Sequence, residues 1–284
     1  MGIVRRTVCG IGVIVAVCAG EVAITLRAAG GAPAWAPAAT AAIHPGVEVT
    51  SPVGQCTANF IFFGPTAMYI GLAAHCTSTG GTTSTDGCTT GSMPLGTAVT
   101  IGGASKPGVL AYNSWLAMQA GGDTSDPNRC GYNDLALVRI DPADAGKVNP
   151  SIPHWGGPVA GGASPGAQLG QKVLSYGNSS LRLGLTQLSP KLGVSLGDTG
   201  GGWSHAVYTV TPGIPGDSGS AFLDDIGRPL GVLSTVEFAP LVLANGVGDV
   251  GRELAYLQAH GGQEVQLAAG TEPFTPDKLP LGIS

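Results

Sequence analysis

The stretch Gly216-Asp217-Ser218-Gly219-Ser220 places a serine inside a short glycine-flanked turn. In Leu72-Ala73-Ala74-His75-Cys76 a histidine follows an apolar run, and in Asn133-Asp134-Leu135-Ala136-Leu137-Val138 an aspartate precedes one. Each segment alone is ordinary turn or strand-end chemistry. Together they supply a hydroxyl, an imidazole and a carboxylate. A serine hydroxyl is a weak nucleophile that needs a base, and the base needs an orienting partner, so these three groups could act together.

The composition favours a compact β protein. The 284 residues include 47 glycines and 21 prolines, with 43% hydrophobic and 11% charged residues. A charged fraction so far below the usual level of about 25% argues against a coiled coil or a long helical bundle. It also argues against charge-driven disorder. The net charge of −5 gives no basic footprint, so nucleic acid is not an expected partner.

Short apolar segments bounded by turn residues predict many β-strands, which favours a sandwich or barrel. The expected strands are 58–63, 67–72, 97–101, 109–118, 134–140, 168–176, 181–188, 205–211, 220–223, 229–236 and 246–250. The Pro- and Gly-rich segment 141–166 divides them into two series and predicts a connection between two domains. Residues 252–257 have helical periodicity and predict a C-terminal helix.

The first residues predict a secretory signal. Arg5 and Arg6 precede the apolar run Thr7–Gly20, which has the length of a signal h-region. An uncleaved membrane anchor is the alternative, but Glu21 would then lie in lipid, where a carboxylate is costly. We expect residues 1–42 to be a signal peptide followed by a short flexible or pro segment. The mature protein should be secreted, without stable membrane association.

Four cysteines follow the predicted signal: Cys56, Cys76, Cys88 and Cys130. They lack the C-x-x-C spacing of zinc sites, and no histidine stands beside them at ligand spacing. No metal and no cofactor are therefore expected. An even number of cysteines in an oxidising compartment predicts two disulfides, for which three pairings are possible.

In the order His75, Asp134, Ser218, the three motifs resemble the chymotrypsin-like serine proteases, and the chain looks most like their secreted bacterial members. The resemblance extends over residues 54–262. It implies an all-β fold of two antiparallel six-stranded Greek-key barrels, with the active site between them and a short C-terminal helix. The expected parts are an N-terminal barrel over 43–145, a C-terminal barrel over 146–270 and an irregular tail over 271–284.

The resemblance also implies the roles of the site residues. His75 would be the general base, Asp134 would orient it, and Ser218 would be the nucleophile. The backbone N–H groups of Gly216 and Ser218 would form the oxyanion hole. The expected substrate-binding residues are Pro212, Ser234, Thr235 and Val236, and Ser234 would also support Asp134.

The same resemblance implies a Cys56–Cys76 disulfide beside the histidine, which leaves Cys88 to pair with Cys130. It places Pro212 at the floor of the specificity pocket, where a basic substrate side chain would need a carboxylate. Val236 would narrow the pocket wall. We therefore expect a small or medium aliphatic side chain at P1, the residue whose carbonyl is attacked.

Two features depart from the family pattern. Ser220 stands where the family usually has a second glycine. The chain also has no Ile-Val-Gly-Gly start, and Ile43 lies too close to Cys56 to reach Asp217 as a new N-terminus. We therefore expect an internal arginine to pair with Asp217, although the sequence does not identify which one.

These observations predict a secreted, monomeric serine endopeptidase that acts on protein or peptide substrates. One alternative is a catalytically inactive secreted binding protein with the same fold. Another is an α/β-hydrolase using Ser218, Asp249 and His260. Its nucleophile elbow would need a glycine in place of Ser220, and the sequence lacks the long helices of that fold.

Overall fold

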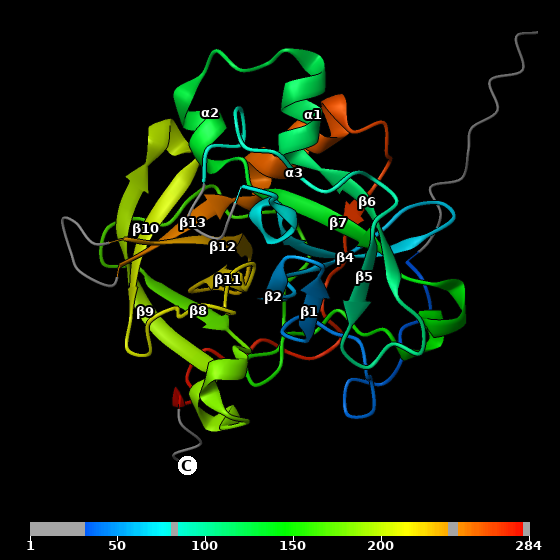
Figure 1. Cartoon of the computed structure of the whole chain (residues 1–284). Coiled ribbons are helices and arrows are strands. Elements are labelled where there is room, and N and C mark those ends of the chain that lie inside the picture. Colours follow the sequence, from blue (N-terminus) through cyan, green and yellow to red (C-terminus); the bar gives the residue numbers. More distant parts are fainter. Residues whose placement is uncertain (1–31, 81–84, 238–243, 281–284) are drawn as a thin grey trace, which may run out of the picture. The chain divides into compact units, whose positions relative to one another are not determined.

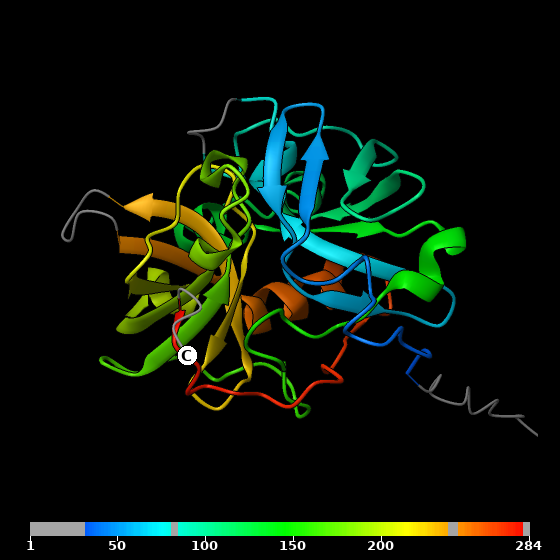
Figure 2. The same cartoon turned by 90° about the horizontal axis from the view of Figure 1, so that it is seen from below.

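The computed structural model describes residues 32–80, 85–237 and 244–280, except for the side chains of Val236 and Glu237. These residues form two curled antiparallel sheets, with few helices (Figures 1 and 2). The predicted signal sequence lies almost entirely outside the described residues. Within the described ranges, no helix has the length and apolar character needed to cross a bilayer.

The first sheet has eight strands in the spatial order β14-β3-β4-β7-β6-β5-β1-β2. Their bounds are β1 (Glu48–Ser51), β2 (Gly54–Thr57), β3 (Ile61–Phe63), β4 (Met68–Ala73), β5 (Ala98–Ile101), β6 (Gly108–Asn113), β7 (Leu135–Arg139) and β14 (Gln266–Leu267). β2 pairs with β1, and β3 pairs with β4. The backbone between β2 and β3 continues both pairings, because Ala58 bonds to Val47 and Asn59 bonds to Gly71. β2 and β3 are thus two halves of one bent strand that closes a six-stranded barrel.

The second sheet is a closed barrel in the order β10-β13-β12-β11-β8-β9. Its strands are β8 (Lys172–Tyr176), β9 (Pro190–Thr199), β10 (Ser204–Thr209), β11 (Ala221–Asp224), β12 (Pro229–Glu237) and β13 (Ala244–Asp249). The later strand β14 belongs to the first sheet, where it pairs with the edge of β3 that does not pair with β4. Gln266 and Leu267 therefore belong to the first sheet, and the expected domain boundary at residue 270 stays a prediction.

Short helices connect and cover the barrels (Figure 1). The α-helices are α1 (Ser114–Gly121), α2 (Pro127–Tyr132) and α3 (Val250–His260), and the 3-10 helices are η1 (Ala74–Thr77), η2 (Pro142–Lys147), η3 (Ser180–Arg182), η4 (Thr186–Leu188) and η5 (Gly200–Gly202). Helix α3 contains the predicted helical segment and contacts both α1 and β12. It thereby packs against elements of both halves of the molecule.

Two predicted strands are wrong in part or in whole. The segment 109–118 is a strand only as far as Asn113, whose side chain accepts hydrogen bonds from Trp115 N and Leu116 N and so begins α1. The segment 181–188 forms η3 and η4 instead of a strand. Its alternating leucines imitate a strand with one buried face, yet Leu183 is 88% exposed.

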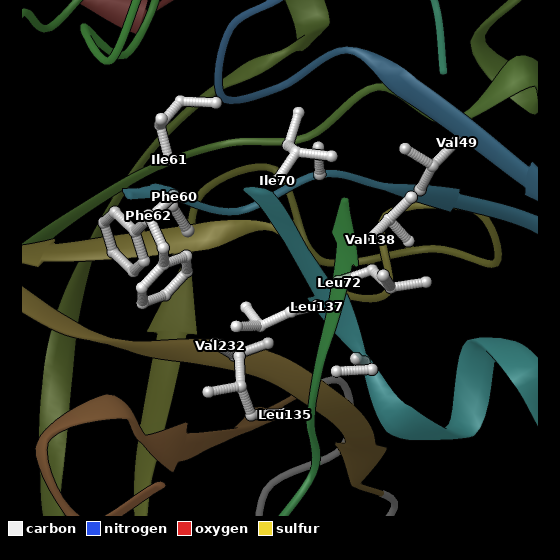
Figure 3. Packing of buried hydrophobic residues seen from close by; sticks show 14 of the residues in the cluster. Val49, Phe60, Ile61, Phe62, Ile70, Leu72, Leu135, Leu137, Val138 and Val232 are labelled. Carbon is white, nitrogen blue, oxygen red and sulfur yellow. The ribbon is translucent and has the colours of Figure 1, made fainter. Parts of the chain in front are cut away.

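The main hydrophobic core lies in the first barrel and continues into the second (Figure 3). Leu135 and Leu137 of β7 belong to the same buried cluster as Val232 of β12. A smaller cluster fills the second barrel and consists of Ala167, Val173, Val207, Phe222, Leu230, Leu233 and Val247. Because removal of apolar surface from water drives this packing, the shared core fixes one barrel against the other.

The described residues before β1 are docked against the connection between the barrels. Ala36 N donates to Val148 O, the Asn149 side chain donates to Ala36 O, and Ile43 forms a parallel bridge with Val148. These contacts hold the described residues before β1 in place, while the expected end of the signal and pro segment at residue 42 stays a prediction.

Candidate active site

His75 lies directly after β4, in the 3-10 turn η1. Two bonds fix this turn from different sides. The Cys56–Cys76 disulfide ties it to β2, and Ala74 N donates to the backbone oxygen of Asp134. The histidine therefore projects from a segment that is anchored to neighbouring strands on both sides.

Asp134 immediately precedes β7 and is almost completely buried. Its Oδ2 is 2.7 Å from His75 Nδ1, and its Oδ1 accepts the His75 backbone N–H at 2.8 Å. Ser234 Oγ on β12 donates to the same Oδ2. The structure thus brings together His75, Asp134 and Ser234 from both barrels.

The charge of Asp134 acts on the imidazole. Burial lowers the pKa of His75, but the charge of Asp134 and the hydrogen bond to it outweigh burial and leave the pKa raised above 6.5. This imidazole therefore keeps its proton to a higher pH than an ordinary histidine does.

A second carboxyl group lies behind Asp134. Glu253 on α3 is fully buried, and its Oε1 accepts the backbone N–H of Asp134 at 2.9 Å. Burial raises the pKa of Glu253 well above its ordinary value, and the charges of Asp134 and Asp249 act in the same direction. No local sequence signal indicates this contact, because residues 134 and 253 are far apart along the chain.

The turn that carries Ser218 lies against the first barrel. Thr57 N of β2 donates to Ser218 O at 2.8 Å. Gly219 has φ +88°, and a Cβ atom there would lie 2.5 Å from Thr57 O and 3.0 Å from Ala73 N. Only glycine allows this close approach to the end of β4, from which His75 follows. No hydrogen bond joins Ser218 Oγ to His75 Nε2 among the described residues, and such bonds are often long before substrate binds.

The backbone of the turn leaves two donors free. Gly216 has φ +96°, and a Cβ atom there would lie 2.4 Å from Gln55 Oε1. Within the described part of the chain, neither Gly216 N nor Ser218 N donates to a protein acceptor. The three carbonyl oxygens of this stretch all accept hydrogen bonds. Pro215 O accepts from Ser179 Oγ, and Gly216 O accepts from Thr57 Oγ1 and Gln55 Nε2. Asp217 O accepts from Ser220 Oγ. These N–H groups are available for an external acceptor.

Asp217 is paired with two internal cations. Its Oδ2 bonds to Arg182 and lies 3.0 Å from Lys191 Nζ. Lys191 is fully buried and also donates to the backbone oxygens of Thr211 and Pro212. Burial lowers the pKa of Lys191, as does the charge of Arg182, against the opposing effect of Asp217. Arg182 is the arginine that the sequence could not identify, and the additional lysine was not anticipated.

The remaining predicted substrate-binding residues lie on β12 or before the serine turn. Pro212 is half-buried, and its backbone oxygen faces Lys191. Ser234 is bonded to Asp134, and Thr235 is half-buried next to it. The side chain of Val236 lies outside the described residues, so its expected place in the pocket wall stays a prediction.

The structure contains the disulfides Cys56–Cys76 and Cys88–Cys130. These cysteines also belong to two small groups, Cys56/His75/Cys76 and Asp86/Cys88/Cys130, whose atoms are close enough to suggest a metal site. A zinc ion binds cysteine as a thiolate, and the sulfur atoms here are already bonded to each other. Neither group is therefore suited to a metal while the disulfides are intact.

The residues of the α/β-hydrolase alternative have other partners. Asp249 Oδ2 lies 2.8 Å from His205 Nε2, while its Oδ1 caps α3 through Arg252 N. His260 Nδ1 lies 3.1 Å from Tyr256 O. The closed antiparallel barrel also excludes the mostly parallel, helix-covered sheet of that fold.

Comparison with known proteins identifies the fold. Neither a family model nor a curated protein matches the sequence. Among solved structures, Thermobifida fusca Protease A is 19% identical with a TM-score of 0.51, and the match covers 81% of this chain and all of that one. A Nocardiopsis protease is 18% identical (TM-score 0.49; 79% and 98% covered), and a glutamic acid specific serine protease is 18% identical (TM-score 0.48; 80% and 100% covered). The chain has the double-barrel fold of the chymotrypsin-like serine proteases.

Proposed function

We propose that the chain is a secreted serine endopeptidase that cleaves peptide bonds through Ser218, His75 and Asp134. The observation that carries the proposal is the two-point attachment of His75 to Asp134, beside a glycine turn that presents Ser218. Ser234 Oγ donates to the same carboxylate and so supports Asp134 from the second barrel.

The proposed reaction uses these groups in two stages. His75 Nε2 takes the proton of Ser218 Oγ as the oxygen attacks the substrate carbonyl, and Asp134 stabilises the resulting imidazolium. The N–H groups of Gly216 and Ser218 donate hydrogen bonds to the negative oxygen of the tetrahedral intermediate. His75 then gives its proton to the leaving amine. Water, activated by the same imidazole, hydrolyses the acyl-enzyme and restores the Ser218 hydroxyl.

For the substrate we propose a small or medium aliphatic side chain at P1. Pro212 offers no carboxylate for a basic side chain, and Lys191 behind it adds positive charge. Both features disfavour lysine and arginine. Apolar contact alone discriminates weakly, by about 1–3 kcal/mol per methylene. Export, a monomeric state and protein or peptide substrates complete the proposal, and the two disulfides are consistent with an oxidising compartment.

The test is a cleavage profile over a peptide library with secreted, purified protein from the full-length gene. Ser218→Ala should lower turnover by about 10⁶-fold, and adding His75→Ala should cost little more, because the triad acts as a unit. A folded protein without turnover on any peptide would favour the inactive binding protein instead. A profile dominated by basic or aromatic residues at P1 would refute the aliphatic pocket while leaving the protease assignment intact.

A further inference from the structure

We propose that two serine hydroxyls, those of Ser179 and Ser220, are positioning groups that aim the oxyanion donors. The identity of these donors, the N–H groups of Gly216 and Ser218, rests on the proposed function. The hydroxyls act from behind the turn and do not touch the substrate.

The first hydroxyl controls the peptide plane between Pro215 and Gly216. Ser179 Oγ donates to Pro215 O at 2.5 Å. In a trans peptide the carbonyl and the following N–H point to opposite sides of the chain. Fixing the Pro215 carbonyl on Ser179 therefore directs the Gly216 N–H away from Ser179. Ser179 is itself held, because it is buried and its own N–H donates to Asp217 Oδ1.

The second hydroxyl controls the plane between Asp217 and Ser218 in the same way. Ser220 Oγ donates to Asp217 O, and Ser220 N donates to that oxygen at 3.0 Å. Ser220 is fully buried. The Ser218 N–H, on the other side of this plane, is directed away from Ser220 and has no protein acceptor among the described residues.

The peptide plane between Gly216 and Asp217 is held by side chains of the first barrel. Gly216 O accepts from Thr57 Oγ1 at 2.8 Å and from Gln55 Nε2 at 3.1 Å. All three consecutive carbonyls, Pro215 to Asp217, are therefore bonded, while the N–H groups of Gly216 and Ser218 have no acceptor in the described part of the chain. Loss of the Ser179 hydroxyl would leave Pro215 O without this donor. Loss of the Ser220 hydroxyl would leave Asp217 O with the Ser220 backbone N–H alone, so each plane would be held less firmly.

This assignment gives a role to Ser220, which stands where the family usually has a second glycine. A glycine at that position would keep the backbone N–H bond to Asp217 O but not the hydroxyl bond. The Ser220 side chain thus adds a second donor to the plane that carries the Ser218 N–H.

The test compares Ser179→Ala and Ser220→Ala with a matched control, Ser195→Ala. Ser195 is also buried in the second barrel, and its Oγ donates to Ala167 O and accepts from Gly197 N. Ser179 Oγ likewise donates to a carbonyl and accepts from Leu181 N. The control therefore removes the same kind of hydrogen bonds without touching the serine turn. Two quantities are measured in each protein, the kinetic constants on a peptide substrate and the amide ¹H–¹⁵N chemical shifts of Gly216 and Ser218.

Removing one oxyanion donor outright costs about 10²–10³-fold in kcat, so a donor that is only misaimed should cost about 10- to 100-fold. We expect this loss in kcat, with KM changed less than about threefold, for Ser179→Ala and Ser220→Ala but not for Ser195→Ala. The Gly216 amide should shift most in Ser179→Ala, and the Ser218 amide in Ser220→Ala.

Unchanged kcat in both variants, or the same loss in Ser195→Ala, would overturn the proposal. Unmoved amide shifts would do so whatever the kinetics. A native protein without any turnover would refute the proposed function instead. The amide shifts would then still decide whether the two hydroxyls hold these planes.

Discussion

Asp134 holds His75 at two points, because one carboxylate oxygen lies 2.7 Å from Nδ1 and the other accepts the backbone N–H at 2.8 Å. The first contact selects the tautomer with its proton on Nδ1 when the ring is neutral. The second fixes the carboxylate against the same residue, so ring and carboxylate cannot separate without breaking both bonds. The arrangement leaves Nε2 as the basic nitrogen.

The raised pKa of His75 predicts the acid limb of the activity profile. A protonated imidazole cannot act as a base, so kcat/KM should fall as the pH drops through a value above 6.5. Asp134→Asn should lower kcat by about 10⁴-fold. It should also move the limb to lower pH, because the charge that raises the pKa is gone. A pH profile of kcat/KM for both proteins provides the check, and an unshifted limb in Asp134→Asn would contradict the assignment.

The buried Glu253 should act as a neutral acid whose carbonyl oxygen supports Asp134. Glu253→Gln keeps an oxygen for the Asp134 N–H, so we expect nearly native kcat/KM and an unmoved acid limb. Glu253→Leu leaves that N–H unpaired, which should cost about 1–3 kcal/mol of unfolding free energy and lower activity as Asp134 shifts.

Exposed Glu264 supplies the control, since Glu264→Leu should change neither quantity. If Glu253→Gln moved the acid limb downward, Glu253 would be ionised at neutral pH, and the neutral-acid interpretation would be wrong.

Because Asp217 pairs with two cations, its substitution should lower the free energy of unfolding more than substitution of Lys191 does. Asp217→Asn leaves Lys191 and Arg182, both buried, without a counter-charge. Removal of one partner from a buried pair typically costs about 3–5 kcal/mol, and here the remaining cations also repel each other. Lys191→Met leaves Asp217 paired with Arg182, so its loss of unfolding free energy should be smaller. Urea unfolding of the two variants measures this, and a larger loss in Lys191→Met would contradict the pairing.

The loss of the His205 proton should make the protein less stable as the pH rises. Its ring lies between Asp249 and Asp198, at 2.8 Å and 2.7 Å. Burial lowers its pKa, but the hydrogen bonds and charges of the two carboxylates outweigh burial and raise it above 6.5. The folded state therefore binds this proton more tightly than the unfolded chain. The resulting stability is fully present below the unfolded pKa and is lost as the pH rises through the folded pKa.

The melting temperature between about pH 6 and pH 9 measures this loss. Asp198→Asn should move the decline to lower pH, because one of the two raising partners is removed. Asp277→Asn is the control, since that side chain is 93% exposed and its contact with Lys172 is long, at 3.4 Å. Identical curves for native protein and Asp198→Asn would show that His205 is not charged in this pair.

The sequence predicted the fold class, which the structure confirms. It also singled out three candidate site residues, whose roles stay a proposal, because their motifs are short and local. His75, Asp134 and Ser218 each stand at a strand end or in a glycine turn that can be seen within six residues. Glu253 and Lys191 could not be found in this way, since their partners Asp134 and Asp217 lie far from them in the sequence and their burial depends on the folded structure. The 181–188 segment failed for the opposite reason. Its local leucine alternation is clear, but Leu181, Leu183 and Leu185 are exposed instead of packed in a core.

The central claim, that Ser218 is an activated nucleophile, is tested most directly by a serine-directed fluorophosphonate on the purified secreted protein. Intact mass and peptide mapping should show one adduct, located on Ser218, and no adduct in Ser218→Ala or after prior denaturation. His75→Ala should label far more slowly, because the base that activates the hydroxyl is gone. A folded native protein that fails to react, or that reacts equally well in Ser218→Ala, would contradict the claim.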